Sequence, residues 1–195
     1  MQYIVKLILT AIIPVLMQVG VINTVSSTPQ EAVNTMMDGL KTCNEQELEK
    51  YMDNTYVNLL MNLQGDEKVV DRMYAALFEN FQYEIVEIAQ KNDVAVAKVA
   101  ITGNDFHKVL KAYDKSSYDY VMKNLYTEDI ADKKKLNGKC LDLYVKEIEK
   151  AAKKEPVEET IFIPLADNGS YGWNVLLSDE LMKEILGDLA LPELS

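Results

Sequence analysis

The hydrophobic pattern is clearest between residues 82 and 106, where β-branched and aromatic residues form two short runs. Such side chains suit a pleated, half-buried surface, so the pattern predicts two paired strands. The polar segment 90–93 between the runs is rich in turn-forming residues. Large and small side chains alternate over residues 94–101, which fits a strand face lying under a layer of helices. Asp105 follows this run and is expected to cap the next helix.

A second pair of strands is predicted between Thr160 and Leu177, where alternate residues are again apolar. The two runs are separated by a segment that contains Asn168-Gly169, the pair that a type I′ turn requires. Pro164 lacks a backbone N–H group, so the first of these strands is expected to have a free edge or a bulge there.

Helical periodicity surrounds the predicted strands on both sides. Thr28, with Pro29 and Glu31 after it, has the arrangement of a helix N-terminus. A second short helix is expected to begin at Asn44 and a further helix after Asp66. Serine and acidic residues from position 178 are expected to cap a last helix.

The segment between the two strand pairs, about residues 106–155, has no strand character and is predicted to be a helical insert. Apolar residues recur at helical spacing over residues 109–126 and again over residues 140–151. The basic run 133–135 is expected to be a solvated turn between these helices. Since no repeat or long linker divides the chain, residues 28–195 are predicted to form a single α+β domain.

Residues 1–27 have the layout of a secretory signal peptide. Lys6 precedes a nearly continuous apolar run over residues 7–22, and small polar residues follow, so cleavage is expected near Thr28. A retained N-terminal membrane segment is the alternative, because the run approaches the lower length limit of a spanning helix. We therefore expect an extracellular or cell-surface protein that contacts a membrane only through residues 1–27, if they remain uncleaved.

The overall charge is acidic, with a formal net charge of −11 for 195 residues. This balance argues against nucleic acid as a partner, because phosphate groups require lysine and arginine. It also argues against a peripheral hold on anionic lipid. A cationic partner is compatible with the charge, although acidity commonly serves solubility alone.

Cys43 and Cys140 raise the question of a disulfide, because an exported chain can oxidise its cysteines. Two separate buried thiols are the other interpretation. The chain has a single histidine, and two cysteines with one histidine do not supply the four ligands of a structural zinc site. No metal and no cofactor are expected.

The order of predicted elements resembles the NTF2-like α+β cone of small exported proteins from Gram-positive bacteria, which carry domains of unknown function. The residues that carry the resemblance are Thr28-Pro-Gln-Glu-Ala, Tyr83-Glu-Ile-Val-Glu-Ile, Val94-Ala-Val-Ala-Lys-Val, Asp105, Gly172-Trp173-Asn174-Val175, Ser178-Asp-Glu-Leu and Ile185-Leu-Gly-Asp-Leu. The resemblance implies a curved antiparallel sheet packed on N-terminal helices, often with a cavity at the open end of the cone. It implies no reaction, since a shared fold does not define a function. Many relatives are lipoproteins, and this chain lacks the cysteine that would carry the lipid.

Enzymes of the resembling fold place Asp, His or Tyr inside the cone, which makes Asp105 and His107 the candidate acid/base pair. The alternative, which we favour, makes Asp105 a helix cap and His107 a solvated residue of the first turn. The chain contains no nucleophile elbow, phosphate-binding loop, zinc-protease motif or dinucleotide fingerprint.

Aromatic residues are the candidate ligand contacts, namely Tyr113, Tyr118, Tyr120 and Tyr126 in the insert and Trp173 in the last strand. They could line a groove for a glycan or peptide, or they could fill space between the insert and the sheet. The resulting hypothesis is an exported, non-catalytic domain that binds a protein, a peptide or a cell-envelope component. The alternatives are a small-molecule enzyme of the isomerase or dehydratase type and a purely structural module.

Overall fold

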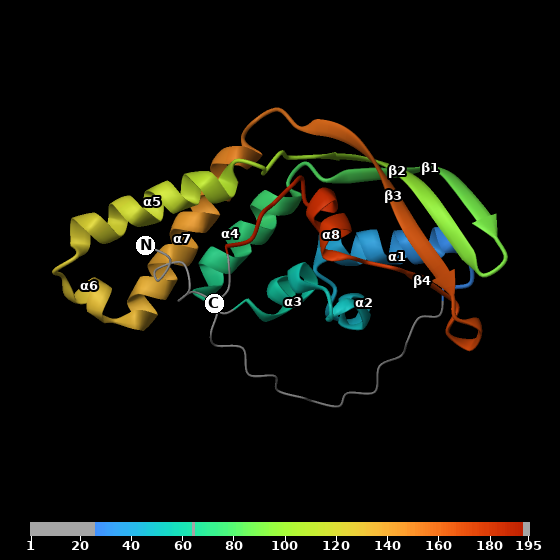
Figure 1. The fold of residues 1–195 in the computed structure, drawn as a ribbon, viewed down its shortest axis with the longest axis horizontal. Helices are drawn as coiled ribbons and strands as arrows, with labels where there is room; N and C mark the ends of the chain where they lie inside the picture. Colours follow the sequence, from blue (N-terminus) through green and yellow to red (C-terminus); the bar gives the residue numbers. More distant parts are fainter. Residues whose placement is uncertain (1–25, 64, 193–195) are drawn as a thin grey trace.

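The computed structural model describes residues 26–63 and 65–192, which form an antiparallel four-stranded sheet, helices on one of its faces, and a helical arm (Figure 1). The elements in chain order are α1 (Pro29–Thr42), α2 (Glu45–Leu48), η2 (Glu49–Tyr51), α3 (Thr55–Asn62), α4 (Glu67–Phe78), β1 (Gln82–Lys91), β2 (Val94–Gly103), α5 (Val109–Asn124), α6 (Glu128–Ala131), α7 (Lys133–Ala152), β3 (Val157–Asp167), η3 (Gly169–Tyr171), β4 (Trp173–Val175) and α8 (Asp179–Ile185). The predicted α+β class, with both strand pairs in one curved sheet, is confirmed. Among the described residues, no helix combines the length and the apolar character that a membrane-spanning helix needs.

Ser26 and Ser27, which the prediction assigns to the leader, make contacts with the folded domain. The leader predicted for residues 1–27 falls outside the described residues except for Ser26 and Ser27. Ser26 is buried, and its carbonyl accepts a hydrogen bond from the backbone N–H of Trp173 at 2.9 Å. The side chain of Glu31 accepts hydrogen bonds from the backbone N–H and the hydroxyl of Ser27. Both serines therefore belong to the folded domain rather than to a segment outside it.

The first strand pair forms as the alternating pattern predicts. β1 and β2 are antiparallel, Lys91 pairs with Val94, and the turn between them is Asn92-Asp93, in which Asn92 adopts a φ of 52°. A bulge between Ile85 and Glu87 interrupts the register of β1. Bulges bend a strand and disturb the ladder of hydrogen bonds at a sheet edge. β1 is an edge strand in the order β1-β2-β3-β4.

The connection in the second pair differs from the prediction. A type I′ turn requires positive φ at both central residues, but Asn168 has a φ of −97° and only Gly169 of the pair is positive, at 64°. The chain instead makes a five-residue connection, residues 168–172, that contains η3. Pro164 lies just beyond the part of β3 that pairs with β4, where a missing backbone donor costs least.

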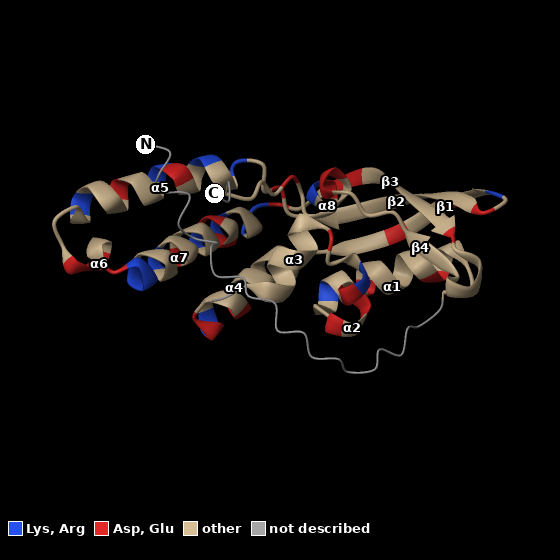
Figure 2. Cartoon of the chain, turned by 60° about the horizontal axis from the view of Figure 1, so that its bottom comes forward, with Lys and Arg blue, Asp and Glu red and all other residues tan. Residues whose placement is uncertain are grey.

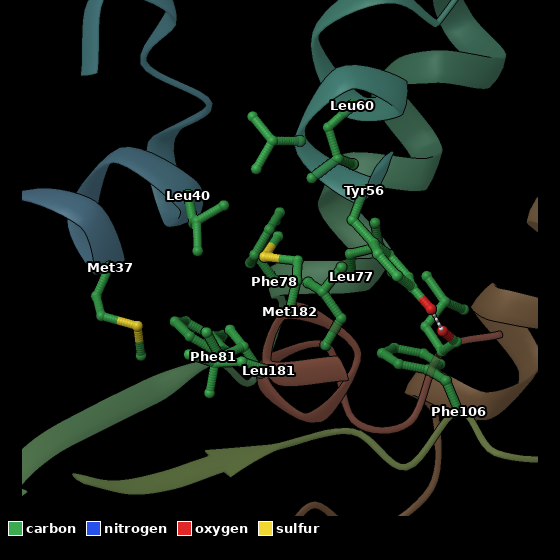
Figure 3. Packing of buried hydrophobic residues seen from close by; sticks show 14 of the residues in the cluster. Met37, Leu40, Tyr56, Leu60, Leu77, Phe78, Phe81, Phe106, Leu181 and Met182 are labelled. Atoms are coloured by element: carbon green, nitrogen blue, oxygen red, sulfur yellow. Dashed lines mark hydrogen bonds between the residues drawn. The ribbon is translucent and has the colours of Figure 1, made fainter. Parts of the chain in front are cut away.

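The inner face of the sheet is packed against α1 and α8, and it is filled with apolar side chains. α1 begins as predicted, because the hydroxyl of Thr28 accepts a hydrogen bond from the backbone N–H of Glu31. The fully or almost fully buried residues of this layer include Val33, Met36, Met37, Leu40, Ala97, Val99, Ile163, Leu165 and Met182. Figure 3 shows part of the same cluster, in which side chains from α1, α3, α4 and α8 converge.

The insert between β2 and β3 forms an arm of three helices, α5, α6 and α7, which extends away from the sheet (Figure 1). Its helical character is confirmed, but two details are wrong. α5 begins at Val109, without a side-chain cap, so Asp105 does not cap it. The basic run 133–135 is the first turn of α7, whose backbone donors are capped by Asp132, and not a solvated turn.

Three contacts fasten the arm to the rest of the domain. Helix α7 packs on α4, where Arg72 binds both oxygens of Glu149, at 2.8 and 2.6 Å, and Asp142 at 3.1 Å. The tail after α8 is held by Tyr56 and Tyr144, whose hydroxyls donate to the carbonyls of residues 189 and 190. At the base of the arm, the carbonyl of residue 187 accepts a hydrogen bond from the backbone N–H of residue 106 at 2.7 Å.

Candidate functional site

The five predicted aromatic contacts separate into buried and exposed groups. Tyr113 and Trp173 are 1% and 6% exposed, so both are core residues. Tyr120 is partly buried between α5 and α7, and the ammonium group of Lys139 lies 5.7 Å from its ring centroid. Tyr118 and Tyr126 are 44% and 98% exposed. The structure therefore does not bring the five residues together, and it leaves two of them available to a ligand.

The buried tyrosine of the arm belongs to a packing cluster. The rings of Tyr113 and Tyr144 meet edge to face, with their centroids 5.4 Å apart. Burial raises the pKa of the Tyr113 hydroxyl, and the neighbouring thiol of Cys140 raises it further. Burial also raises the pKa of Cys140. These groups stay neutral at physiological pH and hold α5 against α7, which is a structural role.

The exposed tyrosines form a surface with two other apolar residues, Met122 and Leu125, which are 53% and 45% exposed. We call these four residues, Tyr118, Met122, Leu125 and Tyr126, the arm tip. Residues 118 and 122 are four positions apart on one face of α5, and residue 125, the C-cap with helical backbone angles, continues that face three positions later. Tyr126 follows the C-cap. Leu125 and Tyr126 belong to the helical apolar pattern of residues 109–126, and the structure places both at the surface.

Charges of both signs surround the arm tip. Asp114, Lys115, Asp119 and Lys123 are all exposed side chains of α5. The whole insert, residues 106–155, contains 12 of the 20 basic residues and 9 of the 31 acidic residues, which gives it a net charge of +3. The rest of the chain then carries −14. Figure 2 shows lysines gathered at the start of α7 and acidic residues spread over the body, so the acidity of the chain is a property of the body.

The predicted acid/base pair lies at the surface near the base of the arm. Asp105 accepts a hydrogen bond from the backbone N–H of His107 at 3.0 Å and contacts the Nδ1 atom of its ring. Burial alone would raise the pKa of Asp105, but these contacts with His107 outweigh it and hold that pKa below its usual value. The two side chains are 42% and 48% exposed, so the pair forms a local turn in water rather than a sealed site.

A small, shallow groove with a volume of about 30 Å³, open to solvent, lies beside this pair. Its apolar side chains come from α4, β2, β3 and α8, and its carboxylates are those of Asp105, Glu159, Glu184 and Asp188. It is not the cavity expected inside a cone, because the inner face of the sheet is filled by the apolar core described above. An acidic rim does not by itself define a ligand, and we assign none to this groove.

The two cysteines are free thiols that lie on different elements. Cys43 ends α1 in a left-handed conformation with a φ of 50°, and Cys140 is buried within α7. Burial raises the pKa of Cys43 to about 11. Both thiols are free in the structure, Cys140 buried and Cys43 partly buried. Within the described residues, no group of three or more His, Cys, Asp or Glu side chains could hold a metal ion.

Known proteins offer one weak structural similarity to this chain and no family. No protein-family model matches the chain. No curated protein matches it either. The structure is similar to the crystal structure of YcdA, a candidate lipoprotein from Bacillus subtilis, with a TM-score of 0.38 and 18% sequence identity. The similarity covers 82% of this chain and 46% of YcdA, so the chain spans less than half the length of that protein.

Proposed function

We propose that this chain is an exported, non-catalytic binding domain of the NTF2-like type, and that the arm tip binds a protein or peptide of the cell envelope. The observation that carries the proposal is the exposure of Tyr118, Met122, Leu125 and Tyr126, close together along the chain, on a protruding helical arm. Exposed apolar side chains that gather in one place mark interaction sites, whereas single ones are ordinary. The order of helices, strand pairs and insert supports the fold type.

The chemistry of the arm tip favours a protein partner. Tyrosine is enriched among the residues that contribute most to protein interfaces, because it combines a large ring with a polar hydroxyl. Anchors spaced at i, i+4 and i+7 are those that a helix presents to an apolar groove of its partner. The mixed charges at positions 114, 115, 119 and 123 form a polar rim, whereas a surface for anionic lipid would carry one sign of charge.

A catalytic role is not part of the proposal. A small-molecule enzyme working inside the sheet would need a pocket with converging polar groups. Apolar side chains occupy the described interior, and the pair Asp105 and His107 faces solvent. Export and a location at the cell surface are proposed from the leader-like residues 1–27, and sequencing the N-terminus of the protein recovered outside the cell tests them.

The binding surface can be tested with a photo-crosslinking amino acid in place of Met122, in intact cells. The matched control places the same amino acid at Tyr171, which is 70% exposed on the connection before β4, far from the arm in the sequence. We expect a discrete crosslinked product from position 122 and none from position 171. The product should decrease at least several-fold when Tyr118 and Tyr126 are changed to Ser. Equal labelling from both positions, or labelling that ignores the two serines, would contradict the proposal.

A further inference from the structure

The outer face of the sheet, opposite the face that packs on α1, is unusually apolar. Alternate residues of a strand point to opposite faces, so in β2 the buried residues 95, 97, 99 and 101 point inward while 94 and 96 point outward. An antiparallel sheet with one solvated face normally carries polar residues there. In this sheet the outward positions include Val94 and Val96 on β2 and Phe162 on β3, while Lys98 and Thr160 are the neighbouring polar positions.

These side chains join into one surface because of the strand register. Val96 lies opposite Ala89 of β1 and opposite Pro164 of β3. The carbonyl of Pro164 accepts a hydrogen bond from the backbone N–H of Leu176 at 2.8 Å, which continues the row past the end of β4. The neighbouring row joins Phe162 to Lys98 and then to Glu87 of β1.

The large members of this surface are strongly exposed. We call them the outer patch: Val86 at 53%, Val94 at 58%, Val96 at 42%, Phe162 at 61% and Leu176 at 53% exposed. A contiguous apolar surface of this kind, drawn from β1, β2, β3 and the residue after β4, is uncommon on a protein that stays alone in water. The described residues contain no element that covers it (Figure 1).

We propose that the outer patch is the contact between two copies of this chain, which stack sheet against sheet about a two-fold axis. Two twisted sheets pack face to face at about 10 Å, with inward side chains interdigitating. Strands spaced by about 4.8 Å and rising about 3.3 Å per residue give the full outer face of β1–β3, of which the outer patch is the apolar part, roughly 500 Å² per copy. Two such faces bury about 1,000 Å², which reaches the lower limit of a specific protein interface.

The charges near the outer patch suit a second copy. Glu87 and Lys98 are opposite one another on neighbouring strands, so the row they share is neutral. A two-fold axis that runs through the patch brings each surface against its own copy, so Lys98 of one copy can face Glu87 of the other. Two further carboxylates of the outer face, Glu84 and Glu158, lie opposite Ala100 and Thr102, toward the end of the strands away from Val94 and Val96. The chain outside the insert has a net charge of −14, and repulsion between these like charges would otherwise oppose the close approach of two copies.

Association through the edge of the sheet is a poorer solution. A free edge strand can pair with another chain when its row of backbone groups is regular. The bulge between Ile85 and Glu87 interrupts that row near the middle of β1. The bulge also turns both Val86 and Glu87 toward the outer face, where Val86 extends the outer patch.

The test is the mass in solution of the exported protein, measured by sedimentation over a range of concentrations. We expect a dimer for the unchanged chain and a Kd at least about 100-fold weaker for Phe162→Glu, because the dimer would bury two unpaired carboxylates. Met122→Glu is the matched control, since Met122 is an exposed apolar residue of the arm tip. It should leave the mass unchanged even if it weakens binding of the proposed partner, so this test is independent of the proposed function.

A second measurement guards against a variant that dissociates because it is misfolded. Val96→Cys places a thiol in the middle of the outer patch, and Lys115→Cys places one on the arm as its control. With copper phenanthroline and oxygen as the oxidant, Val96→Cys should form disulfide-linked dimers at least about tenfold faster than Lys115→Cys. Equal rates, a monomeric unchanged chain at every concentration, or a Phe162→Glu protein that remains dimeric would each overturn the proposal.

Discussion

Gly187 shows how much one position can decide in this fold. It follows α8 with a φ of 58°, a left-handed conformation that side chains other than glycine rarely adopt. A Cβ atom added there would lie 1.9 Å from the carbonyl oxygen of Asn104. The carbonyl of Gly187 also accepts the backbone N–H of Phe106. The tail after α8 and the base of the arm can approach this closely only because residue 187 has no side chain.

The change Gly187→Ala should therefore lower the free energy of unfolding by about 3 kcal/mol, through backbone strain and the displaced carbonyl. Gly138→Ala is the matched control. Gly138 lies inside α7 with nothing within 4 Å of an added Cβ, so alanine there should raise stability by about 0.5–1 kcal/mol. Denaturant unfolding measures both variants. Effects of the same sign would contradict this account.

Local capping signals were the most predictable residue-scale features. Thr28, Asn44, Asp66 and Ser178 each cap the helix that the sequence indicated, because a cap depends on atoms only two or three residues away. Asp105 has the same residue type but bonds only to His107, and α5 begins later. The sequence around Asp105 looks the same as that of a helix cap, and the difference shows only once it is known where the chain turns toward Gly187.

At the scale of elements, the attachment of α7 to α4 depends on one charged cluster. Hydrogen bonds from Arg72 lower the pKa of Glu149. Burial would raise the pKa of Asp142, but hydrogen bonds from Lys146, Arg72 and Lys139 outweigh it and lower that pKa as well. Carboxylates whose pKa is lower in the folded state stabilise it above their unfolded pKa, and the stabilisation disappears as the pH falls through the folded value.

Replacing Arg72 by Met should lower the free energy of unfolding at neutral pH by about 1 kcal/mol. The guanidinium is 38% exposed, so water screens the pairs and keeps the effect this small. The difference from the unchanged protein should shrink below about pH 4, where both carboxylates of the unfolded chain are protonated. Thermal unfolding between acidic and neutral pH measures it. Lys150→Met, which removes an exposed lysine paired with Glu147 within α7, serves as the control and should change little.

The elements themselves differed in how well the sequence could predict them. The strands followed from alternation, because a sheet with one buried face imposes a period of two on every strand. The exposed side of α5 could not be predicted from the sequence, since residues 118, 122 and 125 have the spacing of a core-facing helix. Only the position of α7, which covers the opposite side of α5, shows that this stripe faces solvent.

At the scale of the whole molecule, the tail after α8 ties the body to the arm. Tyr56 comes from α3 in the body and Tyr144 from α7 in the arm, and their hydroxyls donate to successive carbonyls at 2.9 and 3.0 Å. Contacts between residues more than 40 positions apart leave no local signature in the sequence. Neither tyrosine was predicted to have this role, and only the structure reveals it.

The change Tyr144→Phe removes one of these two hydrogen bonds and should lower the free energy of unfolding by about 1 kcal/mol, because it leaves a carbonyl of the tail without its donor. Hydrogen exchange should become faster in the tail and in α7 and stay the same in β2. Tyr126→Phe is the control, as Tyr126 is 98% exposed and should give no change. Uniformly faster exchange across the sheet would contradict a local tie.

One consequence concerns how this protein could diversify. Gly103, the last residue of β2, pairs directly with Val157, the first residue of β3, so the chain leaves and re-enters the sheet at neighbouring points. Partners across an antiparallel ladder are only about 5 Å apart at Cα. A short hairpin loop could therefore replace the entire excursion without altering strand order, at the expense of uncovering α4. Recognition elements of other lengths could be grafted at this same junction while the scaffold keeps its connectivity.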